Sequence, residues 1–185
     1  MSEPQPWRNP RRAPDLAELR AKLPTPRWLV WLWAWWPAIA WAGVIFSLST
    51  DAFSAEHTGS ILEPILRRIV PGMTDELFVS IHYFIRKSAH FTEYFVFCLL
   101  LYRGVRGARK GWRWTWGVAA LFCAAGYSAL DEVHQAFVAS RTASAYDSLL
   151  DSTGAFVAFA VLWMWFRLRR LRGEAEAAAD KAPAD

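Results

Sequence analysis

The amino-acid sequence predicts an all-α polytopic membrane protein with four transmembrane helices and a short extracytoplasmic interfacial helix between the first two. Hydrophobic residues make up 54% of the 185-residue chain, which is more than most soluble domains of this length contain. The mean hydropathy is only +0.10, because charged tails at both ends dilute a strongly apolar middle. Burial of that middle in lipid explains the segregation.

Composition divides the chain into three regions. Residues 1–27 are polar, Pro-rich and basic, which predicts a cytoplasmic tail and no secretory signal peptide. Residues 28–167 hold the apolar runs and are expected to form the transmembrane domain. Residues 168–185 are charged, and we expect a disordered cytoplasmic tail there. Cys98 and Cys123 fall within apolar runs, where small buried thiols are expected rather than a disulfide.

The first two spans differ in length. A helix needs roughly 20 apolar residues to cross about 30 Å of hydrocarbon. Residues 28–49 meet this requirement and include Pro37, which membrane helices tolerate. Residues 88–102 are too few, so this helix is expected to begin near Asp75, with Thr74 as its N-cap.

The third span is predicted at residues 112–138, and the fourth runs from residue 144 to residue 166, before a run of arginines. The connection between the first two spans, residues 51–72, is too polar to cross a membrane. Apolar residues recur at helical spacing within it, namely Ile61, Leu62, Ile65, Leu66 and Ile69. This pattern predicts the short interfacial helix.

Lysine and arginine are distributed unevenly between the two sides. The N-terminal tail holds six, and the second connection and the C-terminal tail hold five each. Five lie on the other side, so both termini are predicted to be cytoplasmic. Tryptophans cluster at the same span ends, where their rings suit the headgroup layer. Arginine interleaved with tryptophan also occurs in nucleic-acid sites, but attraction to anionic lipid explains these residues, so no nucleic-acid partner is expected.

Ionisable residues occur in the apolar runs near their outer ends. Placing such a side chain at the membrane centre costs roughly 2.5 to 3.5 kcal/mol of free energy, and the cost is smaller near the surface, but each residue still needs a polar partner. Helical spacing arranges them in three stripes at one depth, which predicts a shared cluster. The stripes are His82, Arg86, His90 and Glu93, with Lys87 at the edge; Asp131 and Gln135, flanked by Glu132 and His134; and Asp147, Asp151, Gly154 and Ala158. Arg141 lies in the turn between the last two helices.

Structural alternatives exist for several of these residues. Asp147 fits a capping box at the start of the fourth helix, and Arg86 and Lys87 can extend toward the headgroups. Glu93 and Asp131 lie inside apolar runs with no solvent-facing alternative. These two acids are therefore the strongest functional candidates. The small residues Gly154 and Ala158 are expected to let another helix approach closely.

A series of motifs comes in a fixed order along the chain: SLST at 47–50, RKSAHFTEY at 86–94, DEVHQ at 131–135, then Arg141, Asp147, Asp151 and Gly154. In order and spacing they resemble the VanZ-like family of bacterial membrane proteins, over about residues 40–160. That family takes its name from a protein that gives low-level resistance to the glycopeptide teicoplanin. The resemblance implies a role at the cell envelope, in the bacterial cytoplasmic membrane, without defining a reaction.

One functional hypothesis is binding at the outer leaflet. The ligand would be a membrane lipid, a lipid-linked cell-wall precursor or an amphipathic drug such as a glycopeptide, with Lys87, Arg141 and Arg86 contacting an anionic group. Glu132, His134 and Gln135 would belong to the same polar cluster. The structural alternative is an ion network that only fixes helix register.

The other functional hypothesis is an intramembrane enzyme acting on a lipid or lipid-linked precursor. His90, Glu93 and Asp131 are its candidate catalytic residues, with His90 or Glu93 as general acid or base. Asp131, Asp147 and Asp151 would orient that group or hold a divalent cation, because acids outnumber bases in the cluster.

Overall fold

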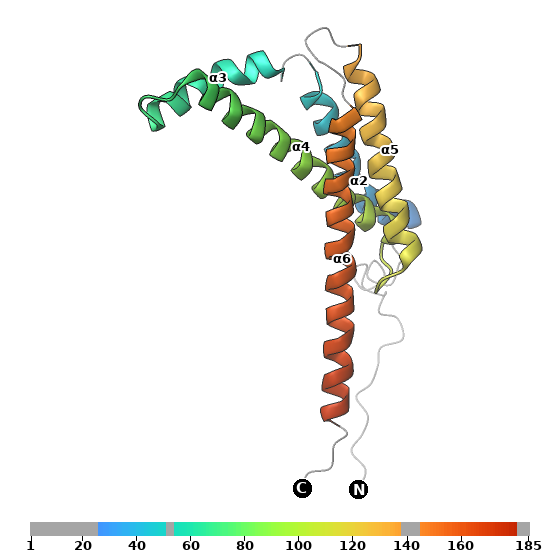
Figure 1. Cartoon of the computed structure of the whole chain (residues 1–185). Coiled ribbons are helices and arrows are strands. Elements are labelled where there is room, and N and C mark those ends of the chain that lie inside the picture. Colours follow the sequence, from blue (N-terminus) through green and yellow to red (C-terminus); the bar gives the residue numbers. More distant parts are fainter. Residues whose placement is uncertain (1–25, 51–53, 138–144, 181–185) are drawn as a thin grey trace, which may run out of the picture.

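The computed structural model describes residues 26–50, 54–137 and 145–180, and within them the chain forms five α-helices and no β-strand. The helices are α2 (Arg27–Leu48), α3 (Ala55–Ile69), α4 (Asp75–Arg106), α5 (Trp114–Gln135) and α6 (Ala145–Ala179) (Figure 1). The all-α prediction is confirmed. Arg141 lies outside the described residues, so its predicted place in the polar cluster stays a prediction.

Two helices among the described residues are long and apolar enough to cross a membrane. They lie at Arg27–Leu48, with 22 residues, and Tyr146–Ala177, with 32 residues. These helices suggest a membrane protein. The helix α6 continues to Ala179, through residues for which composition predicted disorder. An ion pair between Arg170 and Glu174, one helical turn apart, supports this extension.

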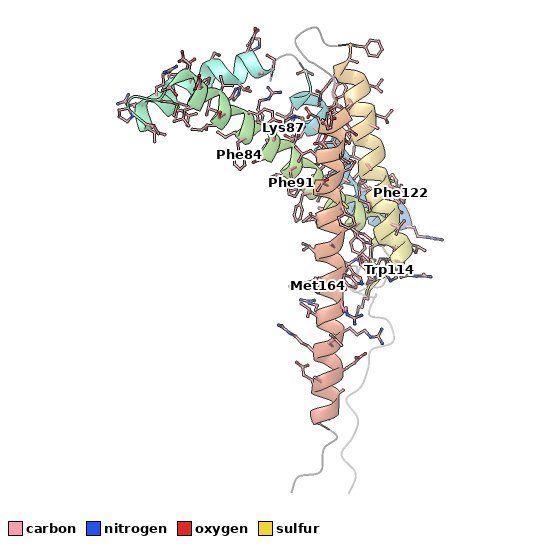
Figure 2. All side chains as sticks on the ribbon, in the orientation of Figure 1. Phe84, Lys87, Phe91, Trp114, Phe122 and Met164 are labelled. Atoms are coloured by element: carbon pink, nitrogen blue, oxygen red, sulfur yellow. The ribbon has the colours of Figure 1, made fainter. Side chains whose placement is uncertain are left out.

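The helices α4, α5 and α6 pack together, and α2 packs against α4. By contrast, α3 and the first part of α4 form an arm, residues 55–86, that projects to one side of the bundle (Figure 1). Arg67 fixes the turn of the arm, because it donates to Glu63 Oε1 at 2.9 Å and to the Met73 carbonyl at 2.9 Å, and also pairs with Asp75. Several large apolar side chains of the arm are exposed, including Phe84 (Figure 2).

Both helices of the arm begin at hydroxyl N-caps. Ser54 Oγ accepts a hydrogen bond from the His57 amide at 3.4 Å, and Thr74 Oγ1 accepts one from the Leu77 amide at 3.3 Å. The predicted N-cap at Thr74 and the helix start at Asp75 are therefore confirmed.

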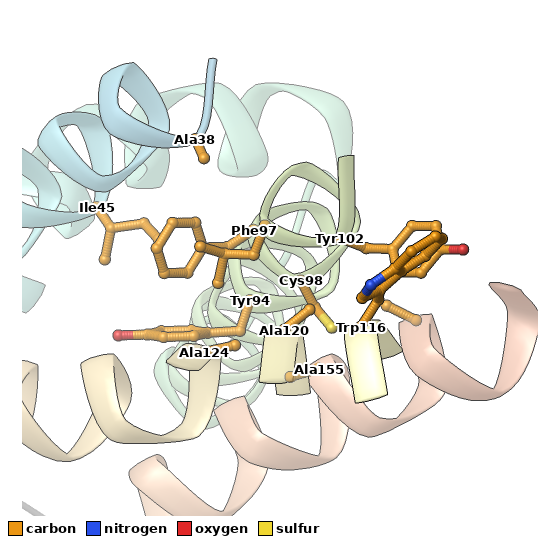
Figure 3. Packing of buried hydrophobic residues seen from close by; sticks show 12 residues of the cluster. Ala38, Ile45, Tyr94, Phe97, Cys98, Tyr102, Trp116, Ala120, Ala124 and Ala155 are labelled. Carbon is orange, nitrogen blue, oxygen red and sulfur yellow. The ribbon is translucent and has the colours of Figure 1, made fainter. Parts of the chain in front are cut away.

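The core lies where α2, α4, α5 and α6 meet, and aromatic side chains of α4 pack against small residues of α5 and α6 (Figure 3). Ala120, Ala124 and Ala155 are fully buried there. At Gly154 a Cβ atom would lie 2.3 Å from the carbonyl oxygen of Phe91, so α4 and α6 touch backbone to backbone. The predicted close approach at the small-residue stripe is confirmed.

The two cysteines are free thiols, as the sequence predicts. Cys98 is buried in the core, whereas Cys123 is exposed on the outer surface of α5. The expectation of burial therefore holds for Cys98 alone.

Candidate functional site

Polar side chains from four helices meet where the arm joins the bundle. Lys87 of α4 marks this place, beside the first turns of α6 (Figure 2). It forms an ion pair with Asp147 of α6, and both side chains are partly buried. Asp147 therefore links two helices in addition to lying at a helix start, and the pair closes one side of the predicted cluster.

Asp131 lies at the junction of α2 and α5. It is buried, and its carboxylate accepts hydrogen bonds from Ser49 Oγ at 2.5 Å and from Gln135 Nε2 at 2.9 Å. Ser49 follows the last residue of α2, so one hydrogen bond fastens the end of that helix to α5. Two donors offset much of the desolvation of a buried carboxylate. Sequence reasoning placed Gln135 here but missed the part played by Ser49.

Asp151 of α6 is the most buried acid of the site. It is fully buried, and its Oδ2 accepts a hydrogen bond from Ser128 Oγ of α5 at 3.1 Å. His90 Nδ1 of α4 lies 3.5 Å from the other oxygen, Oδ1. That distance is longer than a hydrogen bond, and neither atom has another hydrogen-bond partner among the described residues. If the His90 ring moved slightly toward α6, its Nδ1 and the Asp151 Oδ1 would come within hydrogen-bonding distance and form a pair of a base and an acid.

A pocket of about 120 Å³ lies between the arm, the end of α2 and α4, and we call it the arm pocket. Its lining comprises Leu48, Ser49, Thr58, Arg86, Ala89, His90 and Glu93. Arg86 is half-buried, and its Nη1 has no hydrogen-bond acceptor among the described residues. The lining therefore contains the guanidinium of Arg86, the imidazole of His90 and the carboxylate of Glu93. It also includes the residues that face the two buried aspartates, namely Ser49 beside Asp131 and His90 beside Asp151.

The remaining predicted residues lie at the edge of this arrangement. Glu132 is buried on α5. His134 stacks against Phe46 of α2 with ring centroids 4.6 Å apart, which places its ring between α2 and α5. Neither lines the arm pocket. The structure therefore brings His90 and Glu93 together in one wall and places Asp131 and Asp151 behind it.

Hydroxyl side chains complete the site, and the sequence did not identify most of them. Ser148 Oγ lies 3.0 Å from Ser128 Oγ, and Thr58 Oγ1 of the arm lies 3.2 Å from His82 Nε2. A serine or threonine is too common in helices to be identified by type alone. Ser128 is the exception, because its spacing from Asp131 predicts that both lie on one face of α5.

No group of three or more His, Cys, Asp or Glu side chains within residues 26–50, 54–137 and 145–180 is arranged to hold a metal ion. The divalent cation stays a prediction.

Comparison with known proteins gives one match. The family model described as VanZ/LLP1 matches residues 34–167, which include every residue of the arm pocket and both buried aspartates. No curated protein and no solved structure matches the chain.

Proposed function

The chain belongs to the VanZ/LLP1 family, and on that premise we propose that it acts at the bacterial cell envelope. In this role the arm pocket binds the phosphate-bearing head of a membrane lipid or a lipid-linked cell-wall precursor at the outer leaflet. Such binding would contribute to resistance to glycopeptides such as teicoplanin, as the family resemblance implies.

The proposed topology has α2, α4, α5 and α6 crossing the cytoplasmic membrane, with both termini in the cytoplasm. The 32 residues of α4 extend about 48 Å, which exceeds the roughly 30 Å of the hydrocarbon layer. The excess is the part of α4 that belongs to the arm. The excess of lysine and arginine at the far end of the bundle supports the orientation.

The arm is proposed to lie along the outer membrane surface. Ile61, Ile65 and Ile69 recur every four residues on α3 and are 67%, 49% and 69% exposed. A stripe of this kind beside charged residues is typical of a helix whose apolar face enters the boundary between headgroups and acyl chains. The arm pocket would then open at headgroup depth.

One observation carries the proposal: in the wall of the arm pocket, Arg86 presents a buried donor that has no acceptor among the described residues. An unpaired buried guanidinium donor is costly, and an anionic oxygen is the partner that best offsets it. His90 adds a second hydrogen-bonding group to the same lining, whereas Ser49 and Thr58 donate their hydroxyl protons to Asp131 and to the Ser54 carbonyl. A phosphate oxygen of a lipid head would accept from the Arg86 donor.

The size of the arm pocket favours the smaller of the predicted ligands. A volume of about 120 Å³ is enough for several water molecules. A phosphate group fits this space, whereas a glycopeptide is far too large to enter it. The pocket therefore favours a lipid or lipid-linked phosphate over the drug itself.

Replacing Arg86 with glutamine tests the proposal. The variant should bind farnesyl phosphate, a short polyprenyl phosphate, roughly ten- to a hundredfold more weakly, because a charge-assisted hydrogen bond is worth roughly 1.5 to 3 kcal/mol. Titration of the purified protein in lipid nanodiscs, followed by native mass spectrometry, measures the affinity. Farnesol, which lacks the phosphate, should bind weakly to both proteins.

The matched control is Arg68→Gln, which removes an equal charge from the exposed surface of the arm, away from the pocket lining. Its affinity for farnesyl phosphate should stay within about twofold of the wild type. Equal affinity of Arg86→Gln and the wild type would exclude Arg86 as the phosphate contact.

The pair of His90 and Asp151 favours the enzyme hypothesis as a second candidate. Its 3.5 Å separation is close to that of a general base and the group that orients it. An enzyme would release inorganic phosphate or another product from bound substrate over time, and His90→Asn would stop this release. A binding protein would leave farnesyl phosphate unchanged, so the same samples distinguish the two candidates.

A further inference from the structure

The end of the bundle away from the arm carries a second pocket, which the proposed function does not use. It encloses about 520 Å³ between the start of α5 and the second half of α6, and we call it the arginine pocket. The residues that carry the argument are Trp112, Trp114, Trp163, Phe166, Arg167 and Arg170. Trp114 lies beside α6 at this level (Figure 2).

Aromatic packing holds the walls of the arginine pocket in place. The Trp112 ring lies 6.0 Å from that of Phe166, and Trp114 lies 6.1 Å from Trp163, measured between ring centroids. A Cβ atom at Gly117 would lie 2.4 Å from the Trp112 ring, so glycine at this position lets the ring approach α5 closely. The pocket is therefore formed by the fold itself, without a ligand.

The charge of the arginine pocket is positive throughout. Arg167 and Arg170 follow Trp163 by four and seven residues, which places all three on one face of α6. No Asp or Glu is among the residues of 26–50, 54–137 and 145–180 that line the pocket. Arg170 pairs with Glu174 at 2.8 Å, but both side chains are largely exposed, so this pair is weak. Arg167 stacks on Trp163, which leaves the N–H donors at the edge of its guanidinium available.

The part of the pocket before the arginines is apolar, because the rings of Trp114, Trp163 and Phe166 form it. A bound molecule could therefore place a phosphate among the arginines and the first part of a hydrocarbon chain against these rings. Basic pockets beside membrane helices on the cytoplasmic side suit the heads of anionic lipids.

From this arrangement we propose that the arginine pocket binds an anionic phospholipid of the inner leaflet. Arg167 and Arg170 contact the phosphodiester, and the rings of Trp112, Trp114 and Trp163 cover the glycerol and the first part of the acyl chains. The site shares no residue with the arm pocket, so it does not depend on the ligand proposed for that pocket, and its place at the inner leaflet rests on the proposed topology.

The test uses full-length protein in neutral detergent, titrated with dioleoyl phosphatidylglycerol and followed by native mass spectrometry. The double variant Arg167→Gln and Arg170→Gln should bind the first phosphatidylglycerol molecule on the order of tenfold or more weakly. Each basic residue near a membrane surface contributes about a fivefold change in affinity for an anionic lipid. The matched control, Lys110→Gln with Arg172→Gln, removes the same charge from exposed positions outside the pocket lining and should change the affinity by less than about twofold.

Two further ligands identify the source of the phosphate. Dioleoyl phosphatidylcholine, whose head is neutral overall, should bind the wild type more weakly, and glycerol 3-phosphate should not displace phosphatidylglycerol at equal concentration. Full displacement by glycerol 3-phosphate would overturn the assignment to a lipid. Equal losses in the pocket pair and the control pair would overturn the site. Both arginines are exposed, so the melting temperature of the double variant should match that of the wild type, and a thermal melt of each sample separates loss of binding from unfolding.

Discussion

Gly154→Ala should lower the melting temperature of the protein, and Gly154→Leu should prevent it from being purified as a single folded species. A Cβ atom at this position would lie 2.3 Å from the Phe91 carbonyl oxygen, which is a backbone atom and cannot rotate away. The helices α4 and α6 would have to separate, and forcing extra atoms into a packed interface costs typically about 1 to 3 kcal/mol, with more for a larger side chain. Thermal unfolding monitored by size-exclusion chromatography measures the effect.

Gly126→Ala is the control for this prediction. Gly126 lies within α5, and a Cβ atom there would meet nothing within 4 Å. Alanine favours a helix over glycine by about 1 kcal/mol, so this variant should keep or raise the melting temperature. If both alanine variants behave alike, the contact between α4 and α6 is not as close as described.

Asp131→Asn should abolish the envelope phenotype that the wild type restores to a deletion strain, while the melting temperature stays unchanged or rises. Asparagine keeps an oxygen for Ser49, and the Gln135 amide can turn to accept from the new NH₂ group. Removal of the charge also relieves repulsion among the buried acids of the site. Complementation at matched protein levels, together with a thermal melt, separates function from stability.

Ser49→Ala provides the opposite case. It removes the hydrogen bond to Asp131 but keeps the charge, so it should lower the melting temperature, with the phenotype following the amount of folded protein. If Asp131→Asn shows this second behaviour, the cluster is an ion network that fixes helix register, and both functional hypotheses lose Asp131.

Local features of the fold could be predicted from the sequence because local physics determines them. The hydroxyl of Thr74 caps a helix that begins at Asp75, and glycine at residue 154 marks a close helix contact. The direction of the arm could not be predicted, since a continuous helical pattern through α4 does not tell where the helix leaves the bundle. The extent of α6 was also missed, because a charged composition favours disorder unless pairs such as Arg170 with Glu174 form within a helix.

The candidate site was predicted in part. Helical spacing placed His90, Glu93, Asp131 and Asp151 at one depth, since it fixes the face of each stripe. Spacing does not fix how each helix is rotated against its neighbours, so the residue that each side chain contacts could not be predicted. The pairing of Asp131 with Ser49 and of Asp151 with His90 follows from the crossing of the helices, which only the three-dimensional structure supplies.

Labelling of single cysteines tests most directly whether the arm pocket faces the outer leaflet. In a background with Cys98→Ala and Cys123→Ala, Ser60→Cys lies on the exposed surface of α3, and Gly173→Cys lies on the exposed end of α6. The proposed topology predicts that an impermeant maleimide labels Ser60→Cys in intact cells and labels Gly173→Cys only after lysis. Labelling of Gly173→Cys in intact cells, with Ser60→Cys protected until lysis, would place the arm and its pocket in the cytoplasm and contradict the account.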